Sequence, residues 1–243
     1  YGYSKKTNVS KELAQNIQIG SSYYDISADG SKAIYVVTDE NGISINECAI
    51  DGSGVKTIDT DVAQYLVSKN DNYVYYVKTE NSENSVGSYT IYRYDLNKSA
   101  SEMIDDNVIA VTLSKDENAV IYYKYTGNMI KGMDIINDDG DDSEATKALR
   151  AEIADYEFQD ILCEIYRYEN GTSELVSDKA LAAVPMDDKG KFIAYTVPSG
   201  TKKIKVNLSE ISSVNEIAAN YYMQIMKADC DVYIYKLNGF NEY

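Results

Sequence analysis

An internal repeat limits what this chain can fold into more than any other feature of its sequence. The clearest copies of the first repeating unit are IYRYDLNKSASEMIDDNV (91–108) and IYRYENGTSELVSDKA (165–180). Each has a strand with alternating tyrosines, a turn, a second short strand and an acidic or asparagine-containing turn. Further copies occupy 46–62 and 1–17, and a shortened copy occupies 233–243. Self-similarity of this kind is the sequence signature of repeat architectures.

A second unit alternates with the first, at 25–37, 65–77, 111–123 and 184–197. Each copy has an apolar strand end, then a tight turn of Ser, Asp, Asn, Gly or Lys, then a strand in which tyrosine alternates with apolar residues. Such turn chemistry between β-rich segments is typical of a β-hairpin. The chain also has 24 Tyr against 3 Phe and no Trp, and tyrosine favours half-buried pleated surfaces. Together the two units predict four strands per repeat.

The spacing of the repeats predicts a β-propeller. The equivalent positions Ile17, Val62, Val108 and Ala180 lie 45, 46 and 72 residues apart. The first two gaps match the roughly 40–45 residues of a four-stranded propeller blade. We therefore predict an all-β fold, a propeller-like array of about four four-stranded antiparallel blades with two helical insertions. The array forms a single repeat domain, 1–243.

The strand of the repeat on which the chain begins and the strand on which it finishes bear on how the array ends. The chain is expected to supply a fourth strand at 11–17 and to finish on a third strand at 232–237. Propellers have this phase when an N-terminal strand completes the last blade and hides the sheet edges, and a piece of a longer array has it too. Further blades outside this sequence and a β-sandwich stay alternatives, and the oligomeric state stays open. The predicted repeats are roughly 11–50, 55–97, 101–169 and 173–238.

These repeats resemble a known family. SADGSKAIYVV and MDDKGKFIAYTV are similar to the turn and strand of TolB-type propeller repeats. With IYRYDLNKSASEMIDDNV, the pattern resembles propeller-like domains of unknown function in cell-surface proteins of clostridial bacteria. Only the first unit keeps Asp29 and Gly30 together, and two units carry long insertions. The resemblance implies an extracellular bacterial protein, anchored at the cell surface through a segment before Tyr1, without enzyme activity. The likeness to TolB implies contacts between proteins, by analogy of fold.

The first insertion, 128–162, accounts for the long third gap. Apolar residues recur in it at helical spacing and predict a helix over about 143–161. Residues 141–143 are candidates for its N-cap, with acid in the first turn. The predicted apolar face of this helix consists of Ala145, Leu149, Ile153 and Tyr156.

The last repeat has a corresponding insertion at 200–229. It predicts a second helix over about 212–227, in which Ser213 and Glu216 match a capping box. Helices of this length need to bury an apolar face. The predicted apolar face of the second helix consists of Val214, Ile217, Ala218, Tyr221 and Ile225.

The two helices have a structural and a functional interpretation. They pack on each other or cover a blade edge, or else they build a docking surface, because insertions on a repeat scaffold often gather on its binding face. Large aromatic side chains are the usual anchors of such a surface. The residues that we predict to bind a partner are Tyr156, Phe158, Tyr221 and Tyr222.

Residue types alone exclude several kinds of active and metal site. The chain has no histidine, which rules out Ser-His-Asp and Cys-His mechanisms and histidine-dependent zinc sites. Cys48, Cys163 and Cys230 are too few for a four-cysteine zinc site or a disulfide framework, and we expect all three to be reduced. The 39 acidic residues offer many carboxylate pairs, and no pair stands out. We predict no catalytic residue, no metal and no cofactor.

An acidic stretch at 137–144 has the oxygen ligands that calcium takes. It does not fit the EF-hand loop, because Ile135 and Thr146 occupy the first and last ligand positions when Gly140 is the central glycine. We interpret the stretch as a solvated loop before a helix, and calcium binding stays open.

Charge limits the classes of partner. With a net charge of −16 the chain is repelled by phosphate backbones and anionic headgroups, so we expect no nucleic acid partner. No apolar run approaches the roughly 18 residues that cross a bilayer, so this segment is not expected to insert into a membrane. The leading hypothesis is a non-enzymatic extracytoplasmic binding or scaffolding domain with a protein partner. A carbohydrate-binding or glycan-processing module is the alternative, disfavoured by the absence of Trp, and a spacer is the third.

Overall fold

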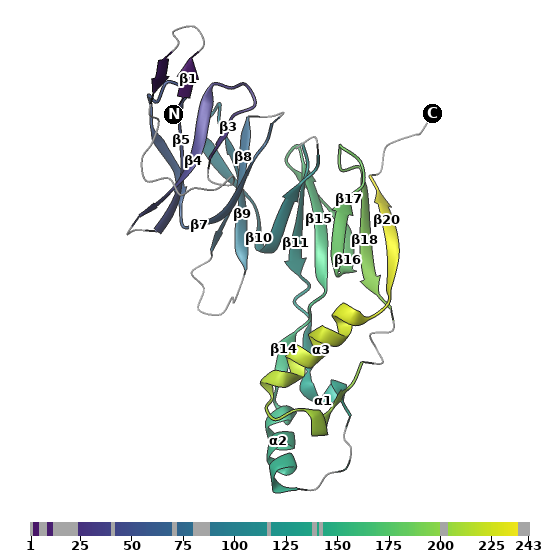
Figure 1. The fold of residues 1–243 in the computed structure, drawn as a ribbon. Helices are drawn as coiled ribbons and strands as arrows, with labels where there is room; N and C mark the ends of the chain where they lie inside the picture. Colours follow the sequence, from purple (N-terminus) through teal and green to yellow (C-terminus); the bar gives the residue numbers. More distant parts are fainter. Residues whose placement is uncertain are drawn as a thin grey trace. The chain divides into compact units, whose positions relative to one another are not determined.

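The computed structural model consists mostly of β-strands (Figure 1). The chain divides into two compact units, the first made of 1–123, 167–174 and 187–190, the second of 124–166, 175–186 and 191–243. Described residues are 2–4, 9–11, 24–39, 42–69, 72–79, 88–115, 118–137, 140, 143–199 and 204–237.

A four-stranded antiparallel sheet lies near the start of the first unit. It is a meander in which each strand pairs with the next along the chain, as predicted for one repeat. Before it, β1 (Gly2–Ser4) pairs with β2 (Val9–Lys11). Beyond Lys11, the predicted fourth strand at 11–17 lies outside the described residues. The strands of the sheet are β3 (Tyr24–Ile26), β4 (Lys32–Asp39), β5 (Gly42–Ala49) and β6 (Lys56–Thr60).

The next sheet has seven strands, in the order β16-β15-β11-β10-β9-β8-β7. The long strand β10 serves two repeats, because it pairs with β9 as far as Val108 and has β11 as its other neighbour. Its register shifts between Met103 and Asp105 and again before Val108, and such irregularities bend a strand. The strands are β7 (Val62–Val67), β8 (Tyr73–Thr79), β9 (Tyr89–Asp95), β10 (Ala100–Leu113), β11 (Val120–Tyr125), β15 (Cys163–Glu169) and β16 (Thr172–Ala180).

A buried serine closes the first hairpin of three successive repeats. The backbone N–H groups of Ser27, Ser68 and Ser114 each donate to the carbonyl five residues later, at 3.0, 3.0 and 2.9 Å. The Ser27 hydroxyl accepts from the N–H of Lys32 at 2.9 Å. The Ser114 hydroxyl accepts from the N–H of Ala119 at 3.1 Å. Because the Ser27 and Ser114 hydroxyls each satisfy a backbone donor of the turn, the serine of the predicted turn is a structural residue.

Packing of one sheet on the next forms the core of the first unit. Ile34 and Ile45 of the first sheet are fully buried, in one cluster with Val74 and Tyr76 of β8. Full burial of a large aliphatic or aromatic side chain contributes roughly 1.5–3 kcal/mol. The cluster is completed by Val62, Val67, Tyr94 and Leu96.

The Tyr76 hydroxyl connects the fourth strands of two neighbouring repeats. It lies 2.9 Å from an Asp59 carboxylate oxygen on β6 and 2.9 Å from the Ser101 hydroxyl on β10. A phenol has one proton, so this hydroxyl donates to the carboxylate and accepts from the serine. Burial is the main cause that raises the pKa of Tyr76 above its ordinary value, so the phenol keeps its proton.

The same connection recurs one repeat later. The hydroxyl of the fully buried Tyr122 lies 2.9 Å from an Asp105 carboxylate oxygen on β10 and 2.9 Å from the Ser173 hydroxyl on β16. Phenylalanine would fill the same space but could not donate to the Asp105 carboxylate. The contact explains why these two positions hold tyrosine and not phenylalanine.

The second unit contains a three-stranded antiparallel sheet and the two insertions. No fourth strand pairs with β20 among the residues that the structure describes. The mostly β, propeller-like fold with helical insertions is therefore confirmed, and its last blade has three described strands. These are β17 (Ala182–Pro185), β18 (Phe192–Pro198) and β20 (Cys230–Lys236), in the order β17-β18-β20.

The two insertions share one hydrophobic core, which confirms the prediction that they pack on each other. Ile135, Ile153 and Phe158 of the first insertion are buried with Ile217 and Ile225 of the second. Two short strands, one from each insertion, also pair in parallel. The elements are β12 (Met129–Lys131), α1 (Gly132–Ile135), β13 (Ile136–Asn137), α2 (Glu144–Ala154), β14 (Glu157–Gln159), β19 (Val206–Asn207), the 3-10 turn η2 (Leu208–Glu210) and α3 (Asn215–Lys227).

Helix α2 differs from its prediction at one end. Ser143 is its N-cap, and the Ser143 hydroxyl accepts from the N–H of Thr146 at 3.2 Å, as expected. The helix ends at Ala154 and does not continue to 161, because the residues after it pair as β14 with β12. Gly132 lets α1 approach α2, since a Cβ there would lie 3.1 Å from a methyl group of Ile153.

Helix α3 is capped one residue away from the predicted capping box. The Glu216 carboxylate accepts from the backbone N–H of Ser212 at 2.9 Å and from its hydroxyl at 2.7 Å. The Ser213 side chain does not cap the helix, whose N-cap position is Val214 without a side-chain cap. The predicted capping box of Ser213 and Glu216 was therefore wrong about the serine, because Ser212 contacts Glu216 instead. The hydrogen bonds from Ser212 hold the pKa of Glu216 below its usual value.

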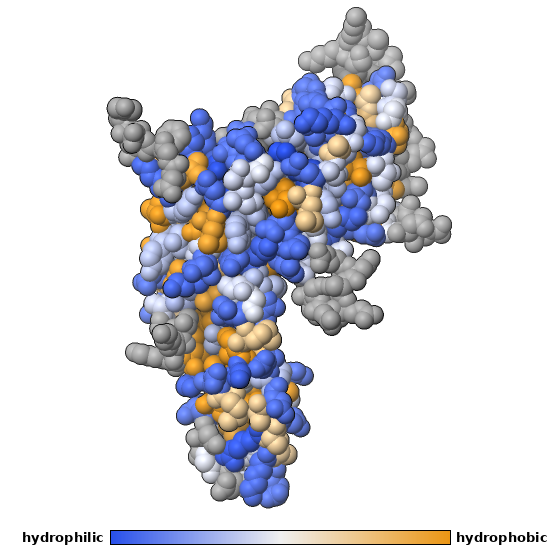
Figure 2. All heavy atoms as spheres, turned by 180° about the vertical axis from the view of Figure 1, so that it is seen from behind, coloured by the Kyte–Doolittle hydropathy of each residue, from blue (hydrophilic) through white to orange (hydrophobic). Residues whose placement is uncertain are grey.

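Hydrophilic side chains cover much of the face shown in Figure 2, with hydrophobic side chains between them. Within the part of the chain that the structure describes, no helix is both long and apolar enough to cross a membrane.

The hydroxyl of Tyr76 is a test of the repeat core. Tyr76→Phe keeps the ring but removes the hydroxyl that donates to Asp59 and accepts from Ser101, so it should lower the free energy of unfolding by about 1–3 kcal/mol. Urea unfolding followed by circular dichroism measures this. Tyr24→Phe, at a position 64% exposed, is the control and should unfold like the wild type. Equal stability of Tyr76→Phe and the wild type would contradict the structural role of the hydroxyl.

Candidate functional site

The four predicted anchor residues lie in or beside the core of the insertions. Phe158 and Tyr221 are buried, each 6% exposed, whereas Tyr156 and Tyr222 are half-buried. The Phe158 ring centroid is 5.9 Å from that of Tyr156, 5.5 Å from that of Tyr221 and 5.8 Å from that of Tyr222. The Tyr222 hydroxyl donates to the Gln159 carbonyl at 2.6 Å. This aromatic cluster joins the two insertions.

Burial corrects the roles predicted for Phe158 and Tyr221. Burial first, and then the nearby Asp160, raises the pKa of Tyr221 to about 12. A side chain that is covered by its own core does not also fill a pocket of a partner. Docking stays a prediction for the half-buried Tyr156 and Tyr222. Helical periodicity identified the apolar face, and it carries no information on what covers that face.

The described residues hold no group of three or more His, Cys, Asp or Glu that is placed to bind a metal ion. Four positions of the acidic stretch 137–144 lie outside these residues, so calcium binding stays open. The three cysteines are free. Burial raises the pKa of Cys163 to about 11 and raises that of Cys48 as well, so both are thiols and poor nucleophiles at neutral pH.

A polar cleft of about 440 Å³ opens in the first unit, and ligand pockets are commonly about 300–1,000 Å³. It lies where the first strands of three successive repeats end. Tyr24 and Asp25 come from β3, Tyr65 and Lys69 from β7 and its turn, and Lys115 from the turn after β10. Sequence reasoning identified these turns and missed the cleft, because the cleft exists only once the strand ends are brought together.

The repeat places two lysines at equivalent positions of this cleft. Lys69 directly follows Ser68, and Lys115 directly follows Ser114. Both serines are buried and hold the same backbone hydrogen bond. The residue after each serine is therefore presented in the same way by two successive repeats.

The charges of the cleft are paired within the chain. The Lys69 ammonium forms an ion pair with the Asp25 carboxylate, and the Lys115 ammonium lies 3.5 Å from a carboxylate oxygen of Asp188. Both lysine side chains are substantially exposed, and exposed ion pairs contribute only about 0–1 kcal/mol. A ligand that offers its own charges can exchange for these partners at little cost.

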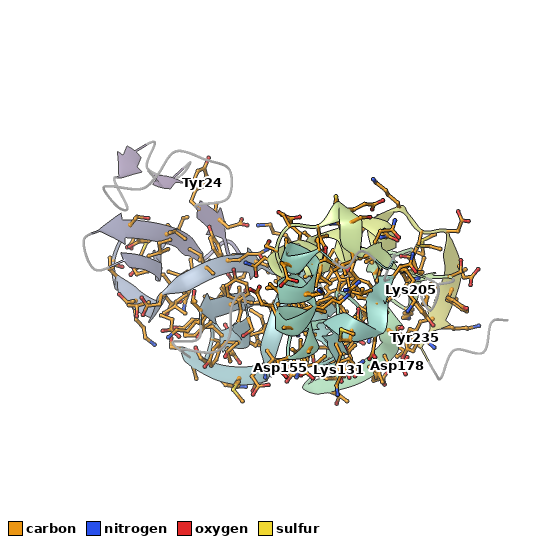
Figure 3. All side chains as sticks on the ribbon, turned by 90° about the horizontal axis from the view of Figure 1, so that it is seen from below. Tyr24, Lys131, Asp155, Asp178, Lys205 and Tyr235 are labelled. Atoms are coloured by element: carbon orange, nitrogen blue, oxygen red, sulfur yellow. The ribbon has the colours of Figure 1, made fainter. Side chains whose placement is uncertain are left out.

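Two tyrosines give the cleft its aromatic surface. Tyr24 is 64% exposed, and Figure 3 labels it on its strand. Tyr65 is half-buried, and burial first, then the Asp25 carboxylate, raises its pKa above the ordinary value. The cleft thus combines two tyrosine rings with the side chains of one aspartate and two lysines.

A smaller concavity of about 80 Å³ surrounds Arg93. The Arg93 guanidinium forms an ion pair with Glu102 at 2.6 Å and lies 4.5 Å from the centroid of the Tyr73 ring. The Tyr168 hydroxyl donates to Glu102 at 2.8 Å. These groups satisfy one another, so the Arg93 concavity is a structural network between strands.

The sheets and their repeat topology define a propeller-like repeat protein. No family model matches the sequence, and no curated protein matches it.

Parts of solved propeller proteins are similar to the chain. The β-propeller domain of the Trilobed protease from Pyrococcus furiosus is 12% identical with a TM-score of 0.48, over 98% of this chain and 59% of that one. The tricorn protease is 12% identical with a TM-score of 0.46, over 95% and 24%. TolB from Acinetobacter baumannii is 17% identical with a TM-score of 0.40, over 73% and 38%. The chain thus spans less than two thirds of the length of each.

The raised pKa of Tyr65 predicts how the first unit responds to alkali. An unfolded tyrosine titrates at about 10, and the folded one titrates higher, so the contribution of neutral Tyr65 is fully present below pH 10. It is lost as the pH rises above this value, because the unfolded chain then releases a proton that the folded chain keeps. Tyr65→Phe should therefore lose less stability than the wild type above pH 10 in urea unfolding. Tyr233→Phe, at an exposed position, should follow the wild type, and identical profiles for all three would contradict the prediction.

Proposed function

We propose that this chain is a non-enzymatic binding or scaffolding domain and that its cleft holds a segment of a partner protein. The observation that carries the proposal is the lining of the cleft. It places the exposed ring of Tyr24 beside the ion pair of Lys69 with Asp25. Tyrosine is enriched where proteins bind one another, and charged groups are common at the rim. A peptide with an aromatic or aliphatic residue next to a charged one suits this arrangement.

The residues of the cleft favour binding over catalysis. Asp25 is the one carboxylate among the described residues that line it, whereas most glycoside hydrolases use a pair. The chain has no histidine for general acid–base catalysis. The two described lysines that line the cleft each have a carboxylate nearby, and a lysine needs to lose its proton before it acts as a nucleophile.

The location of the protein rests on sequence resemblance. The likeness of the turns to TolB-type repeats supports a position outside the cytoplasm, and attachment to the cell surface through a preceding segment is part of the same proposal. The net charge of −16 disfavours a nucleic acid partner, because phosphate backbones repel an acidic chain.

A carbohydrate ligand is the second candidate, and one observation favours it. The exposed Tyr24 ring and the Asp25 carboxylate both line the cleft. Sugar recognition uses such a pairing of a stacking ring with a hydrogen-bond acceptor. The absence of Trp still favours the protein partner.

The experiment screens the full chain on a peptide library and on a glycan array, then measures the best ligand by calorimetry. Tyr24→Ala and Lys69→Ala should each weaken a peptide ligand at least tenfold, which is about 1.4 kcal/mol. Lys98→Ala is the matched control, because Lys98 forms a similar exposed pair, 3.0 Å from Asp95, outside the cleft. Its affinity should equal that of the wild type.

The outcomes separate the two candidates. A glycan that depends on Tyr24 replaces the protein partner by the carbohydrate. A ligand whose affinity neither cleft variant changes, or no ligand on either array, contradicts the cleft as the binding site.

A further inference from the structure

The sheet of the second unit has one face that is rich in exposed apolar side chains. Cross-strand pairing sets Ala182 opposite Thr196 and Thr196 opposite Val232. One pair further along, it sets Val184 opposite Ala194 and Ala194 opposite Ile234. Residues that pair directly across antiparallel strands share a face of the sheet. We call this the Val232 face, made of Ala182, Val184, Ala194, Thr196, Val232 and Ile234.

The Val232 face is exposed although its residues are those of a core. Val184, Val232 and Ile234 are 58%, 68% and 66% exposed. On the opposite face, Ile193 is fully buried. An apolar surface of this kind on a folded protein marks an interaction site more often than a scattered single residue does.

The first repeat shows what normally covers this face. In its sheet, Ile34 pairs with Glu47 and Val36 pairs with Ile45, as Ala194 pairs with Ile234 and Thr196 with Val232 in the last sheet.

In both sheets the same backbone hydrogen bond joins the residue before the second strand to the residue after the third strand. The N–H of Ile50 donates to Ser31, and the N–H of Leu237 donates to Lys191, both at 2.9 Å. Ile45 and Val232 therefore occupy equivalent positions. Ile45 is fully buried because the next sheet packs on it, and no sheet covers Val232 within the described part of the second unit.

The charge of the face limits what can cover it. The chain has 39 acidic residues and a net charge of −16, so two copies repel each other over most of their surface. The Val232 face holds neither Asp nor Glu. It is a part of the surface where two copies can approach without placing carboxylates against one another.

We propose that the Val232 face binds the same face of a second copy of this chain, sheet against sheet. Two sheet faces pack about 10 Å apart with interdigitated side chains, as the sheets of the first unit do with Ile34 and Ile45. A self-complementary apolar patch gives a two-fold dimer, in which each patch covers the other. This surface lies in the second unit and the cleft in the first. A result that disproves the dimer therefore leaves the proposed function unaffected, and the reverse also holds.

The size of the face predicts a weak dimer. Two strands of seven residues and one of four cover roughly 300 Å², whereas a stable interface buries about 800 Å² on each partner. The dimer should therefore form and dissociate with protein concentration. Added salt should strengthen it, because salt screens the repulsion between the two acidic chains.

Sedimentation of the full chain tests the proposal, in reducing buffer because Cys230 is exposed. The wild type should change from monomer to dimer as its concentration rises, with a higher dimer fraction in salt. Val232→Lys should stay monomeric throughout. Val55→Lys is the matched control, because Val55 is 60% exposed and lies in the first unit, and it should dimerise like the wild type.

A measurement on the unmodified chain keeps the test valid if Val232→Lys does not fold, as judged by circular dichroism. Amide hydrogen exchange of Val232 to Ile234 in the wild type should slow with rising protein concentration. Ile234→Lys provides a second monomeric variant. A wild type that is monomeric at every concentration, a dimer that both lysine variants retain, or exchange that is independent of concentration overturns the proposal.

Discussion

The structure depends on one recurring interaction, a buried tyrosine whose hydroxyl reaches a carboxylate and a serine on the fourth strands of neighbouring repeats. Tyr76 makes it with Asp59 and Ser101, and the same triad recurs one repeat later. The ring fills the space between two sheets, and the hydroxyl fixes how their edges align. An apolar ring alone would contribute burial without this alignment, since the hydrophobic effect is not directional. At Tyr76 and Tyr122 the choice of tyrosine is thus a consequence of the architecture.

The candidate cleft follows from the same regularity at the other end of the repeats. Each buried turn serine holds its hairpin in one geometry, so the residue after it is presented alike from repeat to repeat. Ser68 and Ser114 hold the turn in its geometry. The residues that follow them, Lys69 and Lys115, line the cleft. A scaffold that fixes the turn and varies the next residue can change its ligand without changing its fold.

Local patterns in the sequence predicted the elements well, and tertiary features escaped them. Alternation and turn residues predicted the strands and the propeller-like repeat, and helical spacing predicted the buried face of α3, with Ile217 and Ile225 at its centre. The end of α2 was wrong because pairing of β14 with β12 overrides helical propensity after Ala154. The buried state of Phe158 depends on the other insertion, some sixty residues away in the chain. The cleft likewise combines strand ends that no single segment contains.

Ile45 and Val232 show why a repeat cannot be interpreted one unit at a time. Both are β-branched, both lie on the third strand of their sheets, and both face the side on which a following sheet would pack. One is fully buried and the other is two-thirds exposed. The difference lies in what covers each of them, since a sheet in a repeat array cannot bury a face by itself and depends on its neighbours to cover it. The burial of an apolar residue at such a position therefore depends on the neighbouring sheet. The face that contains Val232 holds neither Asp nor Glu, so a second acidic chain can cover it without placing carboxylates against one another.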